Sequence, residues 1–102
     1  MTDRLIYDTR TGTLTLDGEV LDLPRKEREL LVYLIEHPDI VHKKEELIRA
    51  VWGYASLGQS STLTVHVNRL RRKLEQDPRS PNIIECVWGV GYKLRSGKVT
   101  IL

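Results

Sequence analysis

The sequence has little of what several protein classes require. Cys86 is its only cysteine, which excludes an internal disulfide and a cysteine-based zinc site. The histidines, His37, His42 and His66, lack metal-ligand spacing relative to one another. There is no run of about 18 apolar residues and no charged start leading into a short apolar stretch, so neither a membrane-spanning helix nor a secretory signal is expected. We therefore expect a cytoplasmic protein with no membrane contact, metal or cofactor.

The signatures of catalysis are missing as well. Gly89-Val90-Gly91 falls between two predicted strands, whereas a phosphate-binding glycine loop precedes a helix and carries a lysine. Ser61 has no recognisable base partner, and the acidic residues are scattered along the first half of the chain. We therefore do not expect an enzyme.

Charge is small in total but unevenly distributed. The 102 residues are 40% apolar and 29% charged, which is typical of one globular domain over residues 1–102. Residues 1–50 carry eight Lys and Arg against eleven Asp and Glu, whereas residues 51–102 carry eight against three. Attraction to a polyanion is thus expected in the C-terminal half. A solvated basic face without a partner is the alternative, and composition alone does not reject it.

Local patterns predict strands, then three helices, then a hairpin. Alternating segments around the Asp17-Gly18 hairpin signal predict a small antiparallel sheet. Pro24 suits the start of a helix, Pro38 ends that helix, and Gly53 ends the next. The expected elements are strands over about 5–22, helices over about 24–37, 43–52 and 61–76, a wing over about 83–95, and a further strand or tail over 95–102. This order predicts an α+β fold, a winged helix-turn-helix with a C-terminal β-hairpin wing.

The third predicted helix has two distinct faces. Leu63, Val67, Leu70 and Leu74 recur at helical spacing and are expected to face the core. The opposite face is polar and basic around Val65, and in a helix-turn-helix this is the face that meets base edges in the major groove. The residues expected to read bases are Thr62, Thr64, Val65, Asn68, Arg69 and Arg72.

These side chains suit base contacts, although each also has a plainer interpretation. Val65 can touch a thymine methyl group or is simply a surface valine, and Asn68 can read adenine. Arg69 and Arg72 can each present a fork to guanine or hold a phosphate. Any one of them alone fits a solvated helix face. Four basic residues within 69–73, beside a wing, favour DNA.

The ordered segments resemble the C-terminal effector domains of OmpR/PhoB-type bacterial response regulators. The likeness covers nearly the whole chain. The first two helices of the family resemble LPRKERELLVYLIEHPDIVHKKEELIRAVWG, its recognition helix resembles TLTVHVNRLRRKL, and its wing resembles VWGVGYKL. The resemblance implies transcriptional regulation through promoter DNA, by dimers on tandem repeats. It also implies that residues 53–60 approach RNA polymerase, and that a sensor histidine kinase acts on a receiver domain, which residues 1–102 do not include.

The resemblance also implies contacts to DNA by position, at Trp52, Thr62, Val65, His66, Asn68, Arg69, Arg71, Cys86, Trp88 and Tyr92. With neighbouring polar and basic side chains included, the residues expected on the DNA backbone are Trp52, Ser61, His66, Arg71, Lys73, Cys86, Trp88, Tyr92 and Lys93. For His66 we expect a hydrogen-bond donor to phosphate rather than a strong cation. Trp52 fits equally a buried anchor at the helix end or an indole N–H offered to phosphate.

Two departures from the family pattern affect this expectation. The recognition helix often begins with Arg-Thr and continues with Asp, where this chain has Ser61, Thr62 and Thr64. The wing often carries Arg-Gly, where this chain has Trp88-Gly89. Because an arginine suits a narrow minor groove, we expect a weaker minor-groove contribution here. Trp88 either packs on sugar and backbone or braces the hairpin.

Two other functions remain open at this point. One is a winged helix used only for protein–protein contact, with its basic face solvated. The other is a domain that binds DNA without sequence preference or binds RNA. Salt-dependent binding separates DNA binding from the first alternative, and competition with random duplex separates it from the second.

Overall fold

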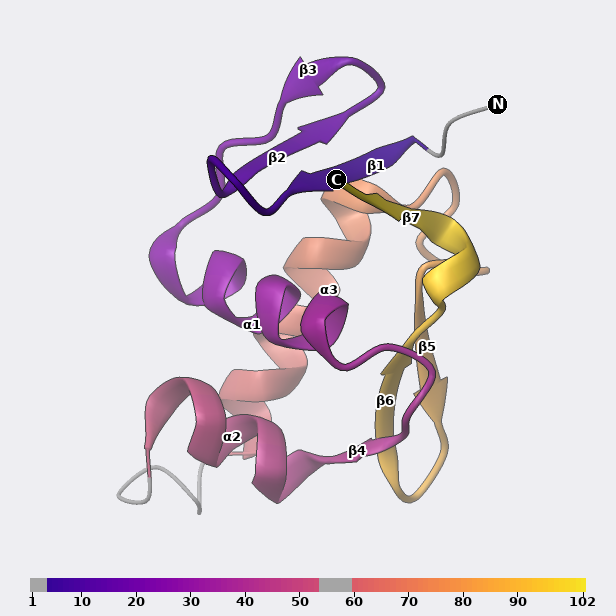
Figure 1. Cartoon of the computed structure of the whole chain (residues 1–102). Helices are drawn as coiled ribbons and strands as arrows, with labels where there is room; N and C mark the ends of the chain where they lie inside the picture. Colours follow the sequence, from indigo (N-terminus) through magenta and orange to yellow (C-terminus); the bar gives the residue numbers. More distant parts are fainter. Residues whose placement is uncertain (1–3, 54–59) are drawn as a thin grey trace.

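The computed structural model describes residues 4–53 and 60–102. Figure 1 shows the helices between two small sheets, with the C-terminus near the upper sheet and the hairpin at the lower right. The winged helix-turn-helix predicted from the sequence is confirmed. In chain order the elements are β1 (Leu5–Asp8), β2 (Thr13–Leu16), β3 (Glu19–Val20), α1 (Arg25–Glu36), β4 (His42–Lys43), α2 (Lys44–Trp52), α3 (Ser60–Leu74), β5 (Ile84–Val87), β6 (Gly91–Leu94), the 3-10 turn η2 (Ser96–Lys98) and β7 (Val99–Ile101).

The helix limits differ by one or two residues from those expected. Pro24 precedes α1 with an extended ψ of 149°, so the helix begins one residue later than expected. Gly53 adopts a φ of 93° directly after α2, a conformation that glycine reaches without steric cost, and the helix stops there as expected. Helix α3 ends at Leu74, two residues before the expected limit.

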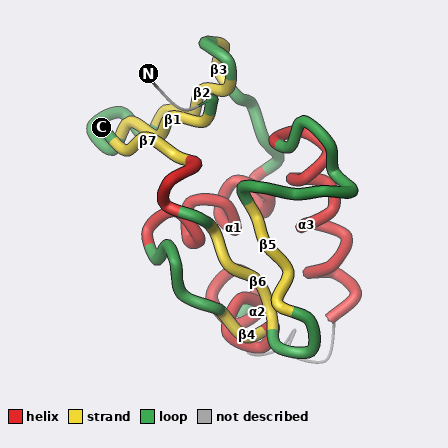
Figure 2. The backbone as a smooth tube through the Cα atoms, turned by 90° about the vertical axis from the view of Figure 1, so that its right-hand side faces the viewer, coloured by secondary structure: helices red, strands yellow, loops and turns green. Residues whose placement is uncertain are grey.

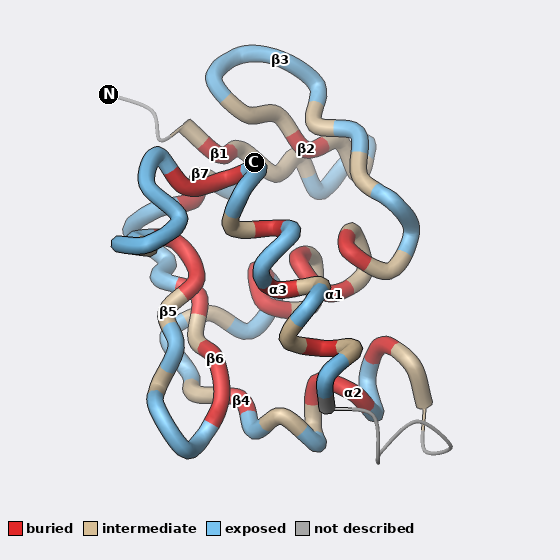
Figure 3. Tube along the Cα trace, turned by 180° about the vertical axis from the view of Figure 1, so that it is seen from behind, coloured by how far each residue is buried: buried red, intermediate tan, exposed pale blue. Residues whose placement is uncertain are grey.

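The apolar stripes of the three helices form one core. The α3 seam, Leu63, Val67, Leu70 and Leu74, is fully buried, as its spacing predicted. Burying one such leucine contributes about 1.5–3 kcal/mol, so this seam fixes which side of α3 faces outward. Figure 3 shows buried and exposed segments alternating along α3. The helices α1 and α2 contribute Leu30, Leu31, Leu34, Ile35, Leu47, Ile48 and Val51.

The N-terminal sheet contains one strand more than the three expected over 5–22. Its order is β3-β2-β1-β7, and the β1–β2 and β2–β3 pairs are antiparallel. Strand β7 pairs with β1 in parallel, with Leu5 opposite Val99. Residues 95–102, expected as a strand or a tail, therefore include a strand. Figure 2 shows β7 beside β1, at the end of the molecule away from the hairpin turn.

The wing sheet also has a strand that the sequence did not predict. Its order is β4-β6-β5, and β4 places His42 opposite Tyr92. A Cβ on Gly91 would lie 1.7 Å from the backbone oxygen of His42, so only glycine allows this close approach of β4 to the wing. The wing is thus joined to the chain segment that leads directly into α2.

Buried hydrogen bonds hold β4 against α1 and α2. The His42 ring is almost fully buried, with Nδ1 2.5 Å from Oε2 of Glu46 and Nε2 2.8 Å from the backbone oxygen of His37. The Tyr33 hydroxyl donates to the same Glu46 oxygen at 2.7 Å. Burial alone would raise the pKa of Glu46, but the hydrogen bonds from Tyr33 and His42 bring it below its usual value. Glu46 therefore remains a carboxylate that links these elements.

Lys73, which was expected on the DNA backbone, also has a structural partner. Its Nζ lies 2.6 Å from Oε1 of Glu27, and Glu27 is only 2% exposed. A buried carboxylate needs a cation or hydrogen-bond donors to offset the loss of water. The pair therefore joins α1 to the last turn of α3, and the expected contact of Lys73 with DNA stays a prediction.

We expect Lys73→Met to lower the free energy of unfolding by about 1–3 kcal/mol, because the buried Glu27 carboxylate would lose its cation. The matched control is Arg72→Met, since Arg72 is exposed and forms no hydrogen bond or ion pair with a described residue. The control should change the free energy by less than about 0.5 kcal/mol. Urea denaturation followed by circular dichroism measures both. Equal losses in the two variants would show that the Glu27–Lys73 pair contributes nothing.

Candidate nucleic-acid interface

The outward face of α3 carries the side chains expected to read bases. Val65 is 44% exposed, and Asn68, Arg69 and Arg72 are exposed around it. Arg69 and Arg72 form no hydrogen bond or ion pair with any described residue. Thr62 and Thr64 are half-buried on the same helix, and Ser61 is exposed in its first turn. This face therefore offers an apolar contact, an amide and two uncommitted guanidinium groups within about three helical turns.

Arg71, which was also expected on the DNA backbone, is held by the wing. Its Nε and Nη2 donate to the backbone oxygen of Ile84 at 3.3 and 3.1 Å. The guanidinium carbon also lies 5.6 Å from the centre of the Tyr92 ring, within the range of a cation–π contact. The structure therefore uses Arg71 to attach β5 to α3.

Glu75 completes this attachment, and the sequence analysis missed it. Its buried carboxylate accepts backbone N–H groups of Asn82 at 2.8 Å, of Ile83 at 3.0 and 3.1 Å, and of Ile84 at 2.9 Å. Arg71 and Glu75 are four residues apart, so they lie on the same side of α3. Together they bind both the N–H and the C=O of Ile84, the first residue of β5. We call these three residues the Ile84 clamp. The only sequence signal for it is an acidic residue directly after the leucine seam.

The wing residues fall into two groups: side chains that contact the rest of the protein and side chains that point away from it. Tyr92 is 5% exposed and belongs to the core, so its expected phosphate contact has almost no surface from which to form. Lys93 pairs with Glu85 at 3.3 Å, and Arg95 contacts the same carboxylate. Hydrogen bonds from Arg95 and Lys93 lower the pKa of Glu85 below its usual value, so the carboxylate keeps its charge. Lys93 is therefore a partly neutralised cation.

Trp88 belongs to the second group, the side chains that point away from the protein. It is 91% exposed, which rules out the expectation that it braces the hairpin. Gly89 next to it has a φ of 79°, as a tight turn between β5 and β6 requires. Cys86 is also exposed on β5. The tip of the wing therefore presents an indole to its surroundings.

Trp52 and His66 contact each other between α2 and α3. Their ring centres are 4.8 Å apart at an interplanar angle of 75°. Nδ1 of His66 lies 2.7 Å from the backbone oxygen of Thr62. Because a carbonyl oxygen only accepts, Nδ1 carries the proton, and Nε2 of the neutral ring can accept but not donate. Nε2 is therefore the ring nitrogen of His66 that remains for a contact outside the helix. Trp52 is half-buried, and both of its expected roles remain open.

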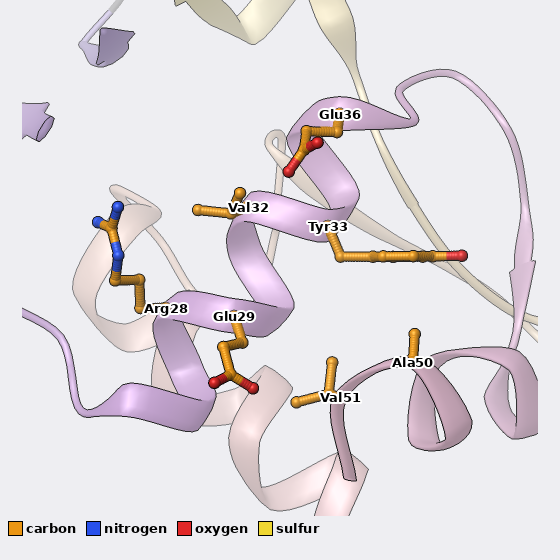
Figure 4. Close-up of a pocket in the computed structure, with 7 residues that line it drawn as sticks. All are labelled: Arg28, Glu29, Val32, Tyr33, Glu36, Ala50 and Val51. Atoms are coloured by element: carbon orange, nitrogen blue, oxygen red, sulfur yellow. The ribbon is translucent and has the colours of Figure 1, made fainter. Parts of the chain in front are cut away.

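A surface pocket lies between α1 and α2, and none of the described side chains of α3 lines it. Figure 4 shows its lining, formed by Arg28, Glu29, Val32, Tyr33, Glu36, Ala50 and Val51. Hydrogen bonds from Arg25 and Lys26 lower the pKa of Glu29 below its usual value, so it is a carboxylate and not a proton donor. Within residues 4–53 and 60–102, no three His, Cys, Asp or Glu side chains are grouped to hold a metal ion. None of the described helices is long and apolar enough to span a membrane.

Comparison with known proteins agrees with this geometry. Residues 18–94 match the family described as transcriptional regulatory protein, C terminal. The chain belongs to this family. The transcriptional regulatory protein ResD of Bacillus subtilis is 44% identical over 94 residues, which are 91% of this chain and 39% of ResD. This effector domain thus spans about two fifths of the length of that curated relative.

Solved structures agree with the family assignment. DrrB of Thermotoga maritima, a response regulator described as an OmpR/PhoB homolog, matches with a TM-score of 0.81 and 32% identity, over 90% of this chain and 42% of DrrB. The DNA-binding domain of the response regulator AdeR, solved in complex with an intercistronic region, matches with a TM-score of 0.74 and 27% identity, over 93% of this chain and 96% of that one. The expected OmpR/PhoB-type effector domain is confirmed.

We expect Glu75→Gln to lower the free energy of unfolding by about 1–3 kcal/mol and to loosen the wing, because an amide replaces one acceptor oxygen with a donor that faces backbone N–H groups. The control is Glu85→Gln, whose exposed ion pairs contribute less than about 1 kcal/mol. Urea denaturation measures the free energy, and amide hydrogen exchange of residues 82–87 measures the wing. Unchanged exchange in Glu75→Gln would mean that the Ile84 clamp does not hold β5.

Proposed function

We propose that this effector domain binds promoter DNA in a sequence-specific way, with α3 in the major groove and the wing on the flanking backbone. The observation that carries the proposal is the outer face of α3, where Arg69 and Arg72 have no partner among the described residues while Arg71 and Lys73 do. Unpaired guanidinium groups beside an exposed valine and an amide suit base edges better than they suit a solvated face.

Six α3 residues are proposed to read bases, and other residues to hold the backbone. The base-reading set is Thr62, Thr64, Val65, Asn68, Arg69 and Arg72. The backbone set is Trp52, Ser61, His66, Cys86, Trp88 and Lys93. Arg71, Lys73 and Tyr92 belong to it as well, but they should contribute less because their side chains already contact protein groups. Because Lys93 is already paired with Glu85, its contribution should be smaller than that of a free lysine. The AdeR domain, solved in complex with an intercistronic region, supports DNA binding by the domain as a whole.

The wider role follows from the family and is also a proposal. We infer that the domain acts without catalysis in the cytoplasm, as the output part of a two-component transcriptional regulator. A receiver domain controlled by a sensor histidine kinase would supply the signal, and dimers would occupy tandem repeats. Residues 53–60 were expected to approach RNA polymerase, but residues 54–59 lie outside the described part of the chain.

Selection of duplexes from a random pool would define a cognate sequence, and titration at several salt concentrations would test DNA binding itself. The logarithm of the binding constant should fall linearly with the logarithm of salt, by about 0.9 per phosphate contact. Binding that does not depend on salt would favour a protein–protein module. Equal binding to selected and random duplexes would favour a non-specific domain.

Substituting Arg69 would locate the source of specificity. We expect Arg69→Ala to weaken binding to the selected duplex by about 5- to 150-fold, because a lost guanine fork costs about 1–3 kcal/mol. Binding to random duplex should weaken by less than about 3-fold. Arg79→Ala is the control, since Arg79 is in the loop after α3 and pairs with Asp77. Fluorescence anisotropy measures each affinity. Equal losses on both duplexes would assign Arg69 to the phosphate backbone.

A further inference from the structure

The buried ring of His42 faces a hydrogen-bond acceptor on each side. Its Nδ1 lies 2.5 Å from Oε2 of Glu46, and its Nε2 lies 2.8 Å from the backbone oxygen of His37. A carboxylate and a carbonyl oxygen can only accept, so each ring nitrogen needs a hydrogen of its own. A neutral imidazole carries one such hydrogen and would turn the lone pair of its other nitrogen toward an oxygen. The geometry therefore requires one proton more than a neutral ring provides.

The other partner of Glu46 does not supply this proton. The Tyr33 hydroxyl donates to Oε2 of Glu46 at 2.7 Å, and this hydrogen bond raises the pKa of Tyr33, so the hydroxyl keeps its hydrogen. If the proton between Nδ1 and Oε2 moved to the oxygen, the pair would still hold one proton more than a carboxylate and a neutral ring. His42 and Glu46 together are thus a site that binds one proton.

Titratable and charged groups face this site from α1, α2 and β6. They are Tyr33 and His37 from α1 and its end, Glu46 and Arg49 from α2, and Tyr92 from β6. His37 uses its own Nδ1 on the backbone oxygen of Tyr33, at 2.9 Å. His37, when charged, and Arg49 both oppose a positive charge on His42. Glu46 is the carboxylate that offsets them, so binding of the proton depends on Glu46.

The site anchors the strand that joins the wing to α2. Of the two residues of β4, His42 is buried and Lys43 is exposed, so the His42 ring is the buried side chain of this strand. On its other side β4 pairs with β6, where His42 is opposite Tyr92 and Lys43 is opposite Gly91. Figure 1 shows β4 between α2 and the hairpin. A change at the His42 ring is therefore carried to the wing through strand pairing.

We propose that His42 and Glu46 form a proton-dependent latch: with the proton bound they hold β4 and the wing against α1 and α2, and its loss at rising pH releases them. An unfolded chain loses the histidine proton at about pH 6.5, whereas the folded site retains it above that pH because both hydrogen bonds need it. Above about pH 6.5 the native state therefore binds more protons than the unfolded state, and the free energy of unfolding falls as the pH rises.

Urea denaturation from about pH 5.5 to about pH 8.5 tests the latch in the free domain. We expect the unfolding equilibrium constant of the wild type to rise by up to about 10-fold per pH unit above about pH 6.5, since unfolding releases one proton. Glu46→Gln should remove this rise, because an amide both donates and accepts and so satisfies a neutral ring. His42→Phe should remove it too, because it keeps a ring that does not titrate. The control is His37→Gln, which retains the backbone acceptor and should keep the wild-type pH dependence.

NMR spectroscopy and hydrogen exchange locate the proton and its effect. Nitrogen spectra of the wild type should show both ring nitrogens of His42 protonated at about pH 7.5, a pH at which a free histidine is neutral. Amide protection of residues 91–94, corrected for the intrinsic effect of pH on exchange, should fall toward about pH 8.5 in the wild type and stay constant in Glu46→Gln.

Three results would overturn the latch. These are an unprotonated ring nitrogen of His42 at about pH 7.5, the same pH dependence of unfolding in wild type, Glu46→Gln and His42→Phe, and wing protection that does not change with pH. None of these measurements uses DNA, so failure of the wild type to bind any selected duplex would reject the proposed function and leave the latch to be decided by them.

Discussion

The angle between α3 and the wing depends on the Ile84 clamp. Arg71 and Glu75, one turn apart on α3, bind the C=O and the N–H of the residue that begins β5. If α3 and the wing contact one duplex together, as proposed, the angle between them has to be fixed before binding. A buried carboxylate with three backbone N–H partners fixes it more tightly than apolar packing does, because hydrogen bonds are directional. The same turn also joins α1 through Lys73 and Glu27.

Several basic side chains in the C-terminal half of the chain bind groups of the protein itself. Residues 51–102 carry five more basic than acidic side chains, which suggests a broad cationic surface. Much of that charge is paired within the protein, because Arg71 and Lys73 bind protein groups and Glu85 pairs with both Lys93 and Arg95. The remaining charge on the outer face of α3 is concentrated at Arg69 and Arg72. These two unpaired guanidinium groups are therefore where attraction of α3 to a polyanion should be strongest.

Periodicity was enough to predict the helices and their core faces, because those features repeat over ten or more residues. The leucine seam of α3 and the stop at Gly53 follow from local spacing and local backbone preference. Strand β4 could not be predicted, since it has two residues and its partner lies about fifty residues further along the chain. The roles of Arg71 and Glu75 were hidden for the same reason. Their partners on β5 are distant in sequence, and a polar side chain on a helix has the same local pattern whether it binds a phosphate or a backbone carbonyl.

The side chain at position 88 takes no part in holding the hairpin together. The hairpin is held by strand pairing, by the burial of Tyr92 and by the close approach of β4 to Gly91, and none of these involves the side chain at the tip. Whatever stands at position 88 therefore affects stability little and acts on what lies outside the protein. An arginine there attracts any region of high negative potential from a distance, whereas an indole gains energy only after it has displaced water from a surface of matching shape. A tryptophan at the tip would therefore add little to the encounter with a charged partner and would act mainly after contact, on how long a complex lasts.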